Sequence, residues 1–86
     1  MKKLWYDRAW DDYEWWQSQD KKTLKRITAL LRDIERNGYH GIGKPEPLLG
    51  RWAGKWSVRI DDKNRIVFKL ENDQLVIFSC KGHYDD

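Results

Sequence analysis

The chain has 86 residues, 17 of them basic and 14 acidic, which gives a formal net charge of +3. A chain of this size buries only about 60 to 65% of its unfolded surface, so a deep enclosed active site is excluded and any chemistry must use an open face or groove. One cysteine and two isolated histidines exclude an internal disulfide and give no metal-ligand cluster, so we expect a single domain over residues 1–86 without a metal or cofactor.

The first half of the chain predicts a short strand followed by two helices. The strand covers residues 2–6, and Asp7 is a candidate N-cap for the first helix. Asp20 is the candidate N-cap of the second helix, which ends at Asn37-Gly38 because glycine adopts the left-handed conformation that closes a helix. The short gap between the helices predicts an antiparallel hairpin. Apolar residues recur on one face of each helix: Ala9, Trp10, Tyr13 and Trp16 on the first, and Leu24, Ile27, Leu31 and Ile34 on the second.

The second half predicts an irregular loop followed by three strands. The loop, residues 38–50, holds four glycines and both prolines, which disfavour regular structure. The strands cover about 55–61, 65–71 and 74–81, where apolar and polar residues alternate or apolar residues run together.

The turn between the first two of these strands sets their register. A three-residue turn ending at Asn64 pairs Asp61 with Arg65. It also pairs Ile60 with Ile66, and Asn64 takes the left-handed conformation that such turns need. A two-residue turn is rejected because it would mix apolar and polar side chains on each face.

These strands predict one apolar face for the helices and one open face that is polar and basic. Arg59 and Arg65 fall together on the basic face, and the last strand, apolar on both faces, takes an interior position in the sheet. The sequence therefore predicts an α+β fold in the order β-α-α-β-β-β, with a mainly antiparallel sheet and a helical hairpin packed on one face.

The chain carries no targeting signal. Lys2 and Lys3 are not followed by the apolar segment of a signal peptide, and no apolar run approaches membrane-spanning length. These features predict a cytoplasmic protein. Cys80 lies in an apolar run and is predicted to be a small buried hydrophobe.

The charge is unevenly distributed along the chain. Residues 43–69 carry seven lysines or arginines against three acidic residues, whereas residues 7–20 carry five acidic residues against one arginine. One basic sector suits a polyanion that binds locally. An ordinary solvated surface is the alternative, and charge alone favours it.

The residue types for RNA cleavage without a metal are present, although far apart in the sequence. The reaction needs a base for the 2′-hydroxyl proton, a cation at the phosphorane and an acid for the 5′-oxygen. Glu46 can serve as the base, held between two prolines, and Arg65, with Arg59, can bind the phosphate. His83 can serve as the acid, because an imidazole titrates near working pH, and Tyr84 can donate to the phosphate or stack on a base.

Each of these residues also has a simpler interpretation. Glu46 by itself is an exposed loop glutamate, and composition alone favours this. The two arginines are equally well explained as solvated strand residues. His83 is then an ordinary terminal histidine, and Tyr84 an aromatic side chain that packs at the edge of the sheet.

Several short motifs occur in order along nearly the whole chain. They are Lys3-Leu4-Trp5, Trp10-Asp11-Asp12-Tyr13, Gly41-x-Gly43-Lys44-Pro45-Glu46-Pro47-Leu48, Trp56-Ser57-x-Arg59-Ile60, Asn64-Arg65-Ile66-Val67 and Cys80-x-x-His83-Tyr84. Together they resemble the Txe/YoeB toxins of the RelE/ParE superfamily. The glycine-proline loop combined with a terminal His-Tyr pair is specific to that branch.

The resemblance implies the toxin of a type II toxin–antitoxin pair, a ribosome-dependent endonuclease that cuts mRNA in the ribosomal A site without a metal. By family position it implies Glu46 as general base, Arg65 as the phosphate-stabilising cation and His83 as general acid. Tyr84 would orient the substrate, and the product ends would be a 2′,3′-cyclic or 3′-phosphate and a 5′-hydroxyl. Further RNA contacts are expected from five basic residues: Arg59, Lys44, Arg51, Lys55 and Lys81.

The resemblance also implies partners. A cognate antitoxin of the YefM/Phd type would cover the toxin face with its C-terminal segment, and operator DNA would be bound only through that antitoxin. The 70S ribosome and its mRNA would be the other partners, and toxin dimers occur in this branch.

Three positions depart from the family pattern. Leu49 and Gly50 stand where a basic residue often follows the proline-rich motif, and Lys63 stands where a glutamate is common. The tail Asp85-Asp86 extends beyond the tyrosine that commonly ends these chains. Its two carboxylates favour a protonated His83 but also repel RNA.

Two other classes of function compete. Toxins of the ParE branch share this fold, act by binding a protein such as gyrase, and lack the acid–base set that is present here. A plain nucleic-acid-binding module would need the arginines but would be indifferent to loss of Glu46 or His83.

The aromatic residues of the first helix exceed what one helix face can bury. Either Trp15 or Trp16 stays partly exposed and serves the antitoxin or a second toxin, or both cap the seam between the helices. The sequence supports the two alternatives equally.

Overall fold

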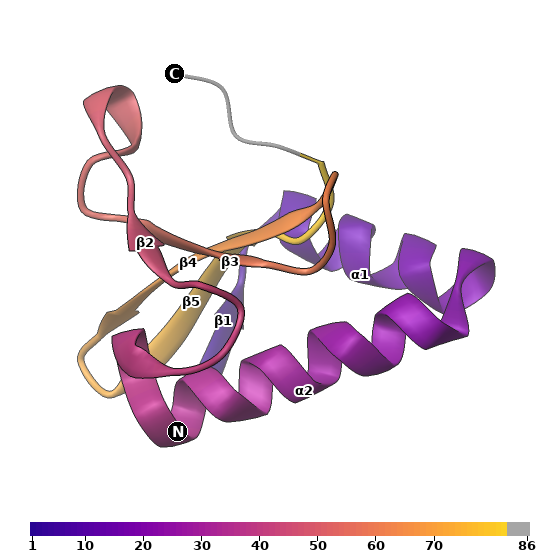
Figure 1. The fold of residues 1–86 in the computed structure, drawn as a ribbon, viewed down its shortest axis with the longest axis horizontal. Coiled ribbons are helices and arrows are strands. Elements are labelled where there is room, and N and C mark those ends of the chain that lie inside the picture. Colours follow the sequence, from indigo (N-terminus) through magenta and orange to yellow (C-terminus); the bar gives the residue numbers. More distant parts are fainter. Residues whose placement is uncertain (83–86) are drawn as a thin grey trace.

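A five-stranded sheet with two helices on one face makes up residues 1–82, the part of the chain that this computed structural model describes (Figure 1). The elements are, in chain order, β1 (Lys2–Trp5), α1 (Asp7–Gln19), α2 (Lys21–Asn37), β2 (Glu46–Pro47), β3 (Trp56–Arg59), β4 (Arg65–Glu71) and β5 (Gln74–Ser79). The predicted α+β fold with its helical hairpin is confirmed. The short strand β2 lies inside the segment that the sequence predicts to be irregular.

The strands are ordered β1-β5-β4-β3-β2 across the sheet. β1 runs parallel to β5 and every other neighbouring pair is antiparallel, so the sheet is mainly antiparallel as predicted. β5 is apolar on both faces because it lies between β1 and β4, which confirms its interior position. The turn from β4 to β5 is a two-residue hairpin in which Asn72 and Asp73 have positive φ angles of 51° and 58°.

The first helix begins one residue earlier than a cap at Asp7 would place it. The N–H of Tyr6 still donates to Ile77 O of the sheet (3.0 Å), and Tyr6 O accepts the N–H of Trp10 (3.0 Å). Tyr6 is therefore the N-cap residue, and the prediction of Asp7 as N-cap is wrong. Asp7 stands instead in the first helical turn, where its negative charge interacts favourably with the helix dipole.

The buried face of α1 differs in part from the predicted face. Ala9 and Trp16 are buried as expected, but the side chain of Trp10 is 45% exposed and Asp12 is buried instead, at 8% exposure. Trp15 is 42% exposed and Trp16 only 6%. Trp15 is therefore the tryptophan that stays partly exposed, while its role toward the antitoxin or a second toxin stays a prediction.

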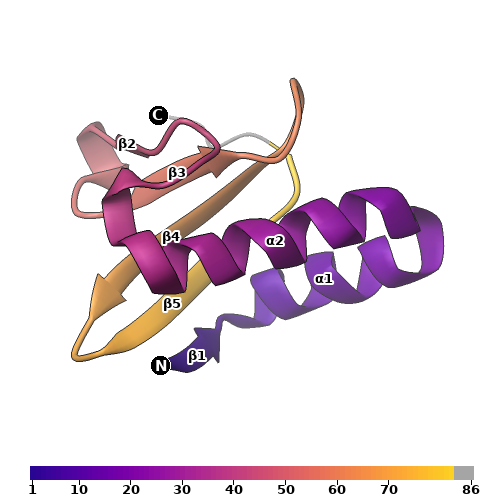
Figure 2. The same ribbon diagram turned by 60° about the horizontal axis from the view of Figure 1, so that its bottom comes forward.

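The second helix follows the sequence closely. The Asp20 carboxylate accepts hydrogen bonds from the Thr23 hydroxyl (2.7 Å) and the Thr23 N–H (3.1 Å), and these bonds lower the pKa of Asp20. Gly38, with φ of 62°, ends the helix. Figure 2 shows α1 and α2 side by side and running in opposite directions, as predicted. The predicted core positions Ile27, Leu31 and Ile34 are buried, and so is Leu30.

The register between β3 and β4 is displaced by two residues from the prediction. Arg59, not Asp61, lies opposite Arg65, and Val58, not Ile60, lies opposite Ile66. The displacement is an even number of residues, so Arg59 and Arg65 still share a face.

The cause of this displacement is a turn closed by side chains. Asp61 Oδ1 accepts the N–H groups of Lys63 and Asn64 (2.8 Å each), and Asn64 O accepts the N–H of Ile60 (3.0 Å). Asn64 does not have a positive φ, so its predicted left-handed conformation is also wrong. The connection is a five-residue loop, and strand pairing resumes only at Arg65.

The sheet face opposite the helices is not wholly open, contrary to the prediction. Val67 and Val76 are buried there, and so is Ser57. The Phe78 ring on the same face lies 4.6 Å from the Tyr6 ring, and the Lys55 ammonium lies 4.8 Å from the Phe78 centroid. This face therefore combines an apolar floor with a rim of cationic side chains.

Two glycines allow the segment between α2 and β2 to lie close to the core. A Cβ on Gly41 would overlap the Asp33 carboxylate, which accepts the N–H of Ile42 (2.8 Å). Gly43 has φ of 81°, and a Cβ there would lie 2.8 Å from Leu30 Cδ2. These close approaches explain the Gly-x-Gly pattern at the start of the loop that carries Glu46.

We expect Gly43→Ala to destabilise the protein more than Gly50→Ala. Both glycines have positive φ, but a Cβ on Gly50 would meet nothing within 4 Å. The difference in the free energy of unfolding between the two variants therefore measures the cost of the clash between the new Cβ and the core. It should be about 1–3 kcal/mol. Urea unfolding at pH 7 measures it. Equal losses in the two variants would mean that the loop moves away without cost.

Candidate active site on the sheet face opposite the helices

The sheet register brings the candidate base and both candidate phosphate-binding arginines to one face. Glu46 of β2 lies opposite Ser57 of β3, and Arg59 of β3 lies opposite Arg65 of β4. Ser57 and Arg59 are two residues apart on the same strand and therefore share a face. The Cα atoms of Glu46 and Arg65 are thus on the order of 10 Å apart. At this distance the two long side chains can both reach one phosphodiester.

The segment that carries Glu46 is fixed to β3 on both sides. Before it, Gly43 O accepts the N–H of Arg59 at 2.7 Å. After it, the N–H of Leu48 donates to Lys55 O at 2.9 Å, and Leu48 is buried. Glu46 itself is exposed. The carboxylate therefore reaches solvent from a backbone that is held in place.

Arg65 is anchored at both its side chain and its backbone. Its Nη1 donates to Asp61 O (2.8 Å) and to Asn64 O (3.2 Å), and the side chain is partly buried. These bonds use one end of the guanidinium and leave its Nε and Nη2 groups as the donors that can face an anion. Arg59 is exposed beside it.

The four candidate RNA-binding lysines and arginines beyond Arg59 are spread over the molecule. Lys44 and Arg51 are exposed, and Lys44 has a positive φ of 52°. The Lys55 ammonium lies 5.6 Å from the Trp52 ring centroid as well as against Phe78. Lys81 lies over a ring of helix α1, with its Nζ 4.2 Å from the Trp15 centroid. Because its ammonium contacts helix α1, Lys81 is not part of the group of candidate residues on β2, β3 and β4.

His83 and Tyr84 lie outside the residues that the structure describes. The described chain ends at Gly82, whose O accepts the N–H of Arg65 at 3.0 Å. The residue before His83 is therefore bonded to the residue proposed as the phosphate-binding cation.

Three residues of helix α1, none of which the sequence analysis placed at the active site, hold the chain just before this point. Asp12 Oδ2 accepts the N–H of Cys80 (3.0 Å), and Trp16 Nε1 donates to Cys80 O (2.8 Å). Arg8 Nη2 donates to Lys81 O at 3.1 Å. The sequence signal for Asp12 was its place in the motif Trp10-Asp11-Asp12-Tyr13, which does not say that the carboxylate is buried, because acidic residues are usually exposed.

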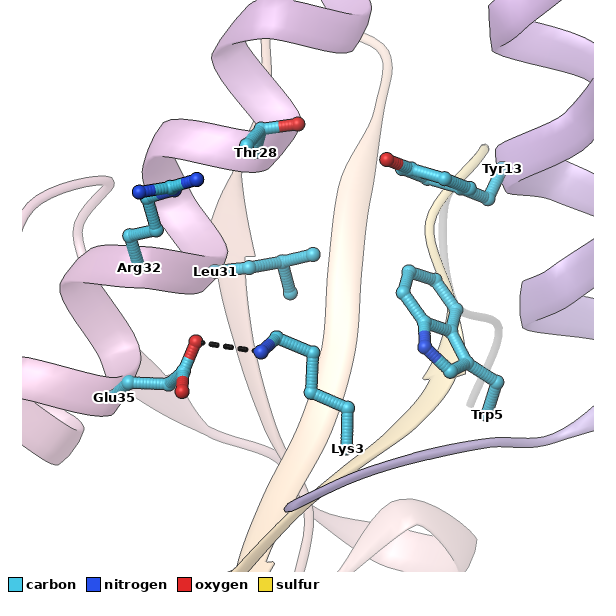
Figure 3. A pocket seen from close by; sticks show the side chains of 7 residues that line it. All are labelled: Lys3, Trp5, Tyr13, Thr28, Leu31, Arg32 and Glu35. Atoms are coloured by element: carbon cyan, nitrogen blue, oxygen red, sulfur yellow. Dashed lines mark ion pairs between the residues drawn. The ribbon is translucent and has the colours of Figure 1, made fainter. Parts of the chain in front are cut away.

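A pocket lies on the helix side of the sheet, away from this site. It has a volume of about 370 Å³ and is lined by Lys3, Trp5, Tyr13, Thr28, Leu31, Arg32 and Glu35. Figure 3 shows the Lys3–Glu35 ion pair (2.8 Å) at its edge, with Trp5 and Tyr13 on one side and the α2 residues on the other. It contains none of the candidate site residues Glu46, Arg59 and Arg65, of which Glu46 and Arg59 are exposed.

Within residues 1–82, no cluster of three or more histidine, cysteine or acidic side chains is arranged to hold a metal ion. Neither described helix is long and apolar enough to cross a membrane.

The element order and the sheet topology define a toxin fold of the RelE type. The family model for the YoeB-like toxin of bacterial type II toxin–antitoxin systems matches residues 5–84. The toxin YoeB of Escherichia coli K12 is 43% identical over 84 residues, which cover 98% of this chain and 100% of that one. The chain belongs to the YoeB-like toxin family.

Solved structures agree with this assignment. A YoeB/ParE toxin from Agrobacterium tumefaciens matches with a TM-score of 0.94 and 41% identity, over 98% of this chain and 100% of that one. The toxin chains of a YoeB–YefM complex and of a YoeB dimer, both from Staphylococcus aureus, each match with a TM-score of 0.91, at 39% and 40% identity, over 98% of both chains.

We expect Cys80 to be inert in the native protein. Burial first, and then the negative charge of Asp12, raise the pKa of the thiol to about 12, so about 1 in 10,000 native thiols is ionised at pH 8. A disulfide reagent such as DTNB at pH 8 should label the protein only after denaturant is added. Rapid stoichiometric labelling of the native protein would contradict the buried position of this side chain.

Proposed function

We propose that this toxin is a ribosome-dependent mRNA endonuclease that cuts mRNA in the ribosomal A site and thereby inhibits translation. The observation that carries the proposal is the placement of Glu46 on the same sheet face as the Arg59–Arg65 pair, with Gly82 bonded to Arg65. Glu46 and Arg65, which are 19 positions apart in the sequence, thus share one face of the sheet, and this supports a common role at one phosphodiester.

The proposed reaction uses general acid–base catalysis and no metal. Glu46 removes the proton of the 2′-hydroxyl, and the 2′-oxygen attacks the adjacent phosphorus. Arg65, supported by Arg59, stabilises the negative charge of the phosphorane through N–H donors. His83 protonates the departing 5′-oxygen, and Tyr84 orients the substrate. The products are a 2′,3′-cyclic phosphate, which hydrolysis opens to a 3′-phosphate, and a 5′-hydroxyl.

The open geometry of the site supports dependence on the ribosome. Glu46 and Arg59 are exposed on the surface of the sheet, so the protein by itself surrounds only one side of a bound strand. Positioning of the reacting groups is worth several kcal/mol in such reactions, about 7–11 in favourable cases. A ribosome that holds the codon in the A site would supply the positioning that this surface lacks, and Lys44, Arg51, Lys55 and Lys81 would contact RNA around it.

The proposed partners follow from the family. A YefM/Phd-type antitoxin is the cognate inhibitor, which is supported by the S. aureus YoeB–YefM complex. Operator DNA is bound only through that antitoxin, and the S. aureus YoeB dimer supports a homodimer of this toxin. The chain works as one cytoplasmic domain over residues 1–86.

A protein-binding toxin of the ParE kind is the competing proposal. Such a protein would arrest growth through a target such as gyrase and would not need Glu46. The loop that fixes Glu46 between two prolines, with its backbone bonded to β3, favours the nuclease.

Primer extension on an mRNA in a purified translation system tests the proposal. Glu46→Gln keeps the shape of the side chain but removes the base, so cleavage at ribosome-occupied codons should fall on the order of 10²- to 10⁴-fold. His83→Ala should show a similar loss. Glu14→Gln, which changes an exposed glutamate of helix α1, is the matched control and should cleave like wild type.

Ribosome binding by each variant, measured by co-sedimentation, separates lost chemistry from lost binding. Translation arrest without a cut, equal in all four proteins, would reject the nuclease and favour a protein target.

A further inference from the structure

The backbone at residues 80–82 is held from two sides of the molecule. From helix α1, Asp12, Trp16 and Arg8 bond the N–H and O of Cys80 and the O of Lys81. From the turn between β3 and β4, the Asn64 side chain and the Arg65 backbone N–H form hydrogen bonds with the N–H and the O of Gly82. Asn64 Oδ1 accepts the N–H of Gly82 (2.8 Å), and Gly82 O accepts the N–H of Arg65 (3.0 Å).

The Asn64 side chain is itself fixed at its other end. Its Nδ2 donates to both carboxylate oxygens of Asp61, at 3.0 and 3.1 Å. Asp61 Oδ1 also accepts the N–H of Lys63 and of Asn64. Desolvation by itself would raise the pKa of Asp61, but the hydrogen bonds from Asn64 and Lys63 outweigh it and hold that pKa below its ordinary value. Both ends of the Asn64 amide are therefore in use.

We propose that Asn64 is a positioning residue for the cleavage reaction, and this inference rests on the proposed function. Its amide connects the turn that anchors the Arg65 guanidinium to the backbone of Gly82, the residue before His83. It touches no substrate. Its role is to fix the point from which His83 and Tyr84 extend relative to Arg65, so that the acid and the phosphate-binding cation act on the same phosphodiester.

The geometry explains why a side chain is needed at this place. Gly82 has φ of 81°, a conformation that L-residues rarely adopt, and strand β5 has already ended at Ser79. The Asn64 carbonyl therefore takes the place of a sheet partner for the Gly82 N–H. Asn64 Oδ1 and the Arg65 N–H together give the Gly82 backbone the partners that a neighbouring strand would otherwise supply.

The first test is Asn64→Ala, assayed by single-codon cleavage on programmed ribosomes. Loss of the Gly82 anchor should lower kcat by roughly 10- to 100-fold, because misplacement by about an ångström costs that much, while KM for the ribosome complex stays unchanged. Asp62→Asn changes an exposed carboxylate in the same turn and should behave like wild type. A parallel rise in KM, or activity equal to wild type, would overturn the proposal.

A second test exchanges the amide and the carboxylate of Asn64 and Asp61, so that lost activity can be told apart from lost folding. In Asn64→Asp, two carboxylates face each other and the turn should open, so kcat should fall. Adding Asp61→Asn restores one amide and one carboxylate, again with an acceptor oxygen for the Gly82 N–H, and kcat should recover to within a few-fold of wild type. No recovery in a double variant that melts like wild type would count against the proposal.

Amide hydrogen exchange of Gly82 separates this inference from the proposed function. In Asn64→Ala the exchange of the Gly82 amide should accelerate, whereas core amides such as that of Phe68 should not change. If wild type cleaves and Asn64→Ala cleaves equally well, the positioning role is wrong and the nuclease stands. If wild type does not cleave, the proposed function fails, and the exchange of Gly82 still shows whether Asn64 holds it.

Discussion

The hydrogen bond from the Cys80 N–H to the Asp12 carboxylate ties helix α1 to the segment that follows β5, and the placement of residues 80–82 depends on it. A carboxylate is costly to bury without partners, and here a backbone N–H and the Arg8 guanidinium, with Nε 3.6 Å from Oδ2, accompany it. Helix α1 follows β1 directly, and β1 pairs with β5. The bond therefore fixes helix α1 to the C-terminal end of β5, the strand that pairs with β1.

This constraint divides the sheet into two faces with different tasks. The helices cover one face with the main core, in which Phe68, Leu75 and Ile77 are fully buried. The other face keeps a smaller apolar floor and is left to carry the glutamate and the arginines. In a chain of this size both faces cannot be covered, since there is too little polypeptide for a third layer. The open surface on that side of the sheet follows from this limit.

The sequence predicted the elements because their signals are local. The spacing of Ile27, Leu31 and Ile34 and the cap at Asp20 lie within one helix, and both are found as predicted. The β3–β4 register was missed because a turn closed by the Asp61 and Asn64 side chains has no signature in a turn-type rule. Arg59 and Arg65 could be placed on one face, since an even displacement preserves the face. Their distance from Glu46 could not be predicted, because β2 has only two residues and leaves no strand pattern in the sequence.

The segment that follows β5, residues 80–82, is held in place by other elements of the fold. These residues have left the sheet, so their backbone polar groups take partners from other elements. Here three side chains of α1 and one of the β3–β4 turn act on residues 80–82. Those anchors exist only when α1 has packed and β5 has entered the sheet between β1 and β4. On the proposed assignment, the acid therefore joins the base and the arginines only in the completed fold, so a partly folded toxin would lack a working site.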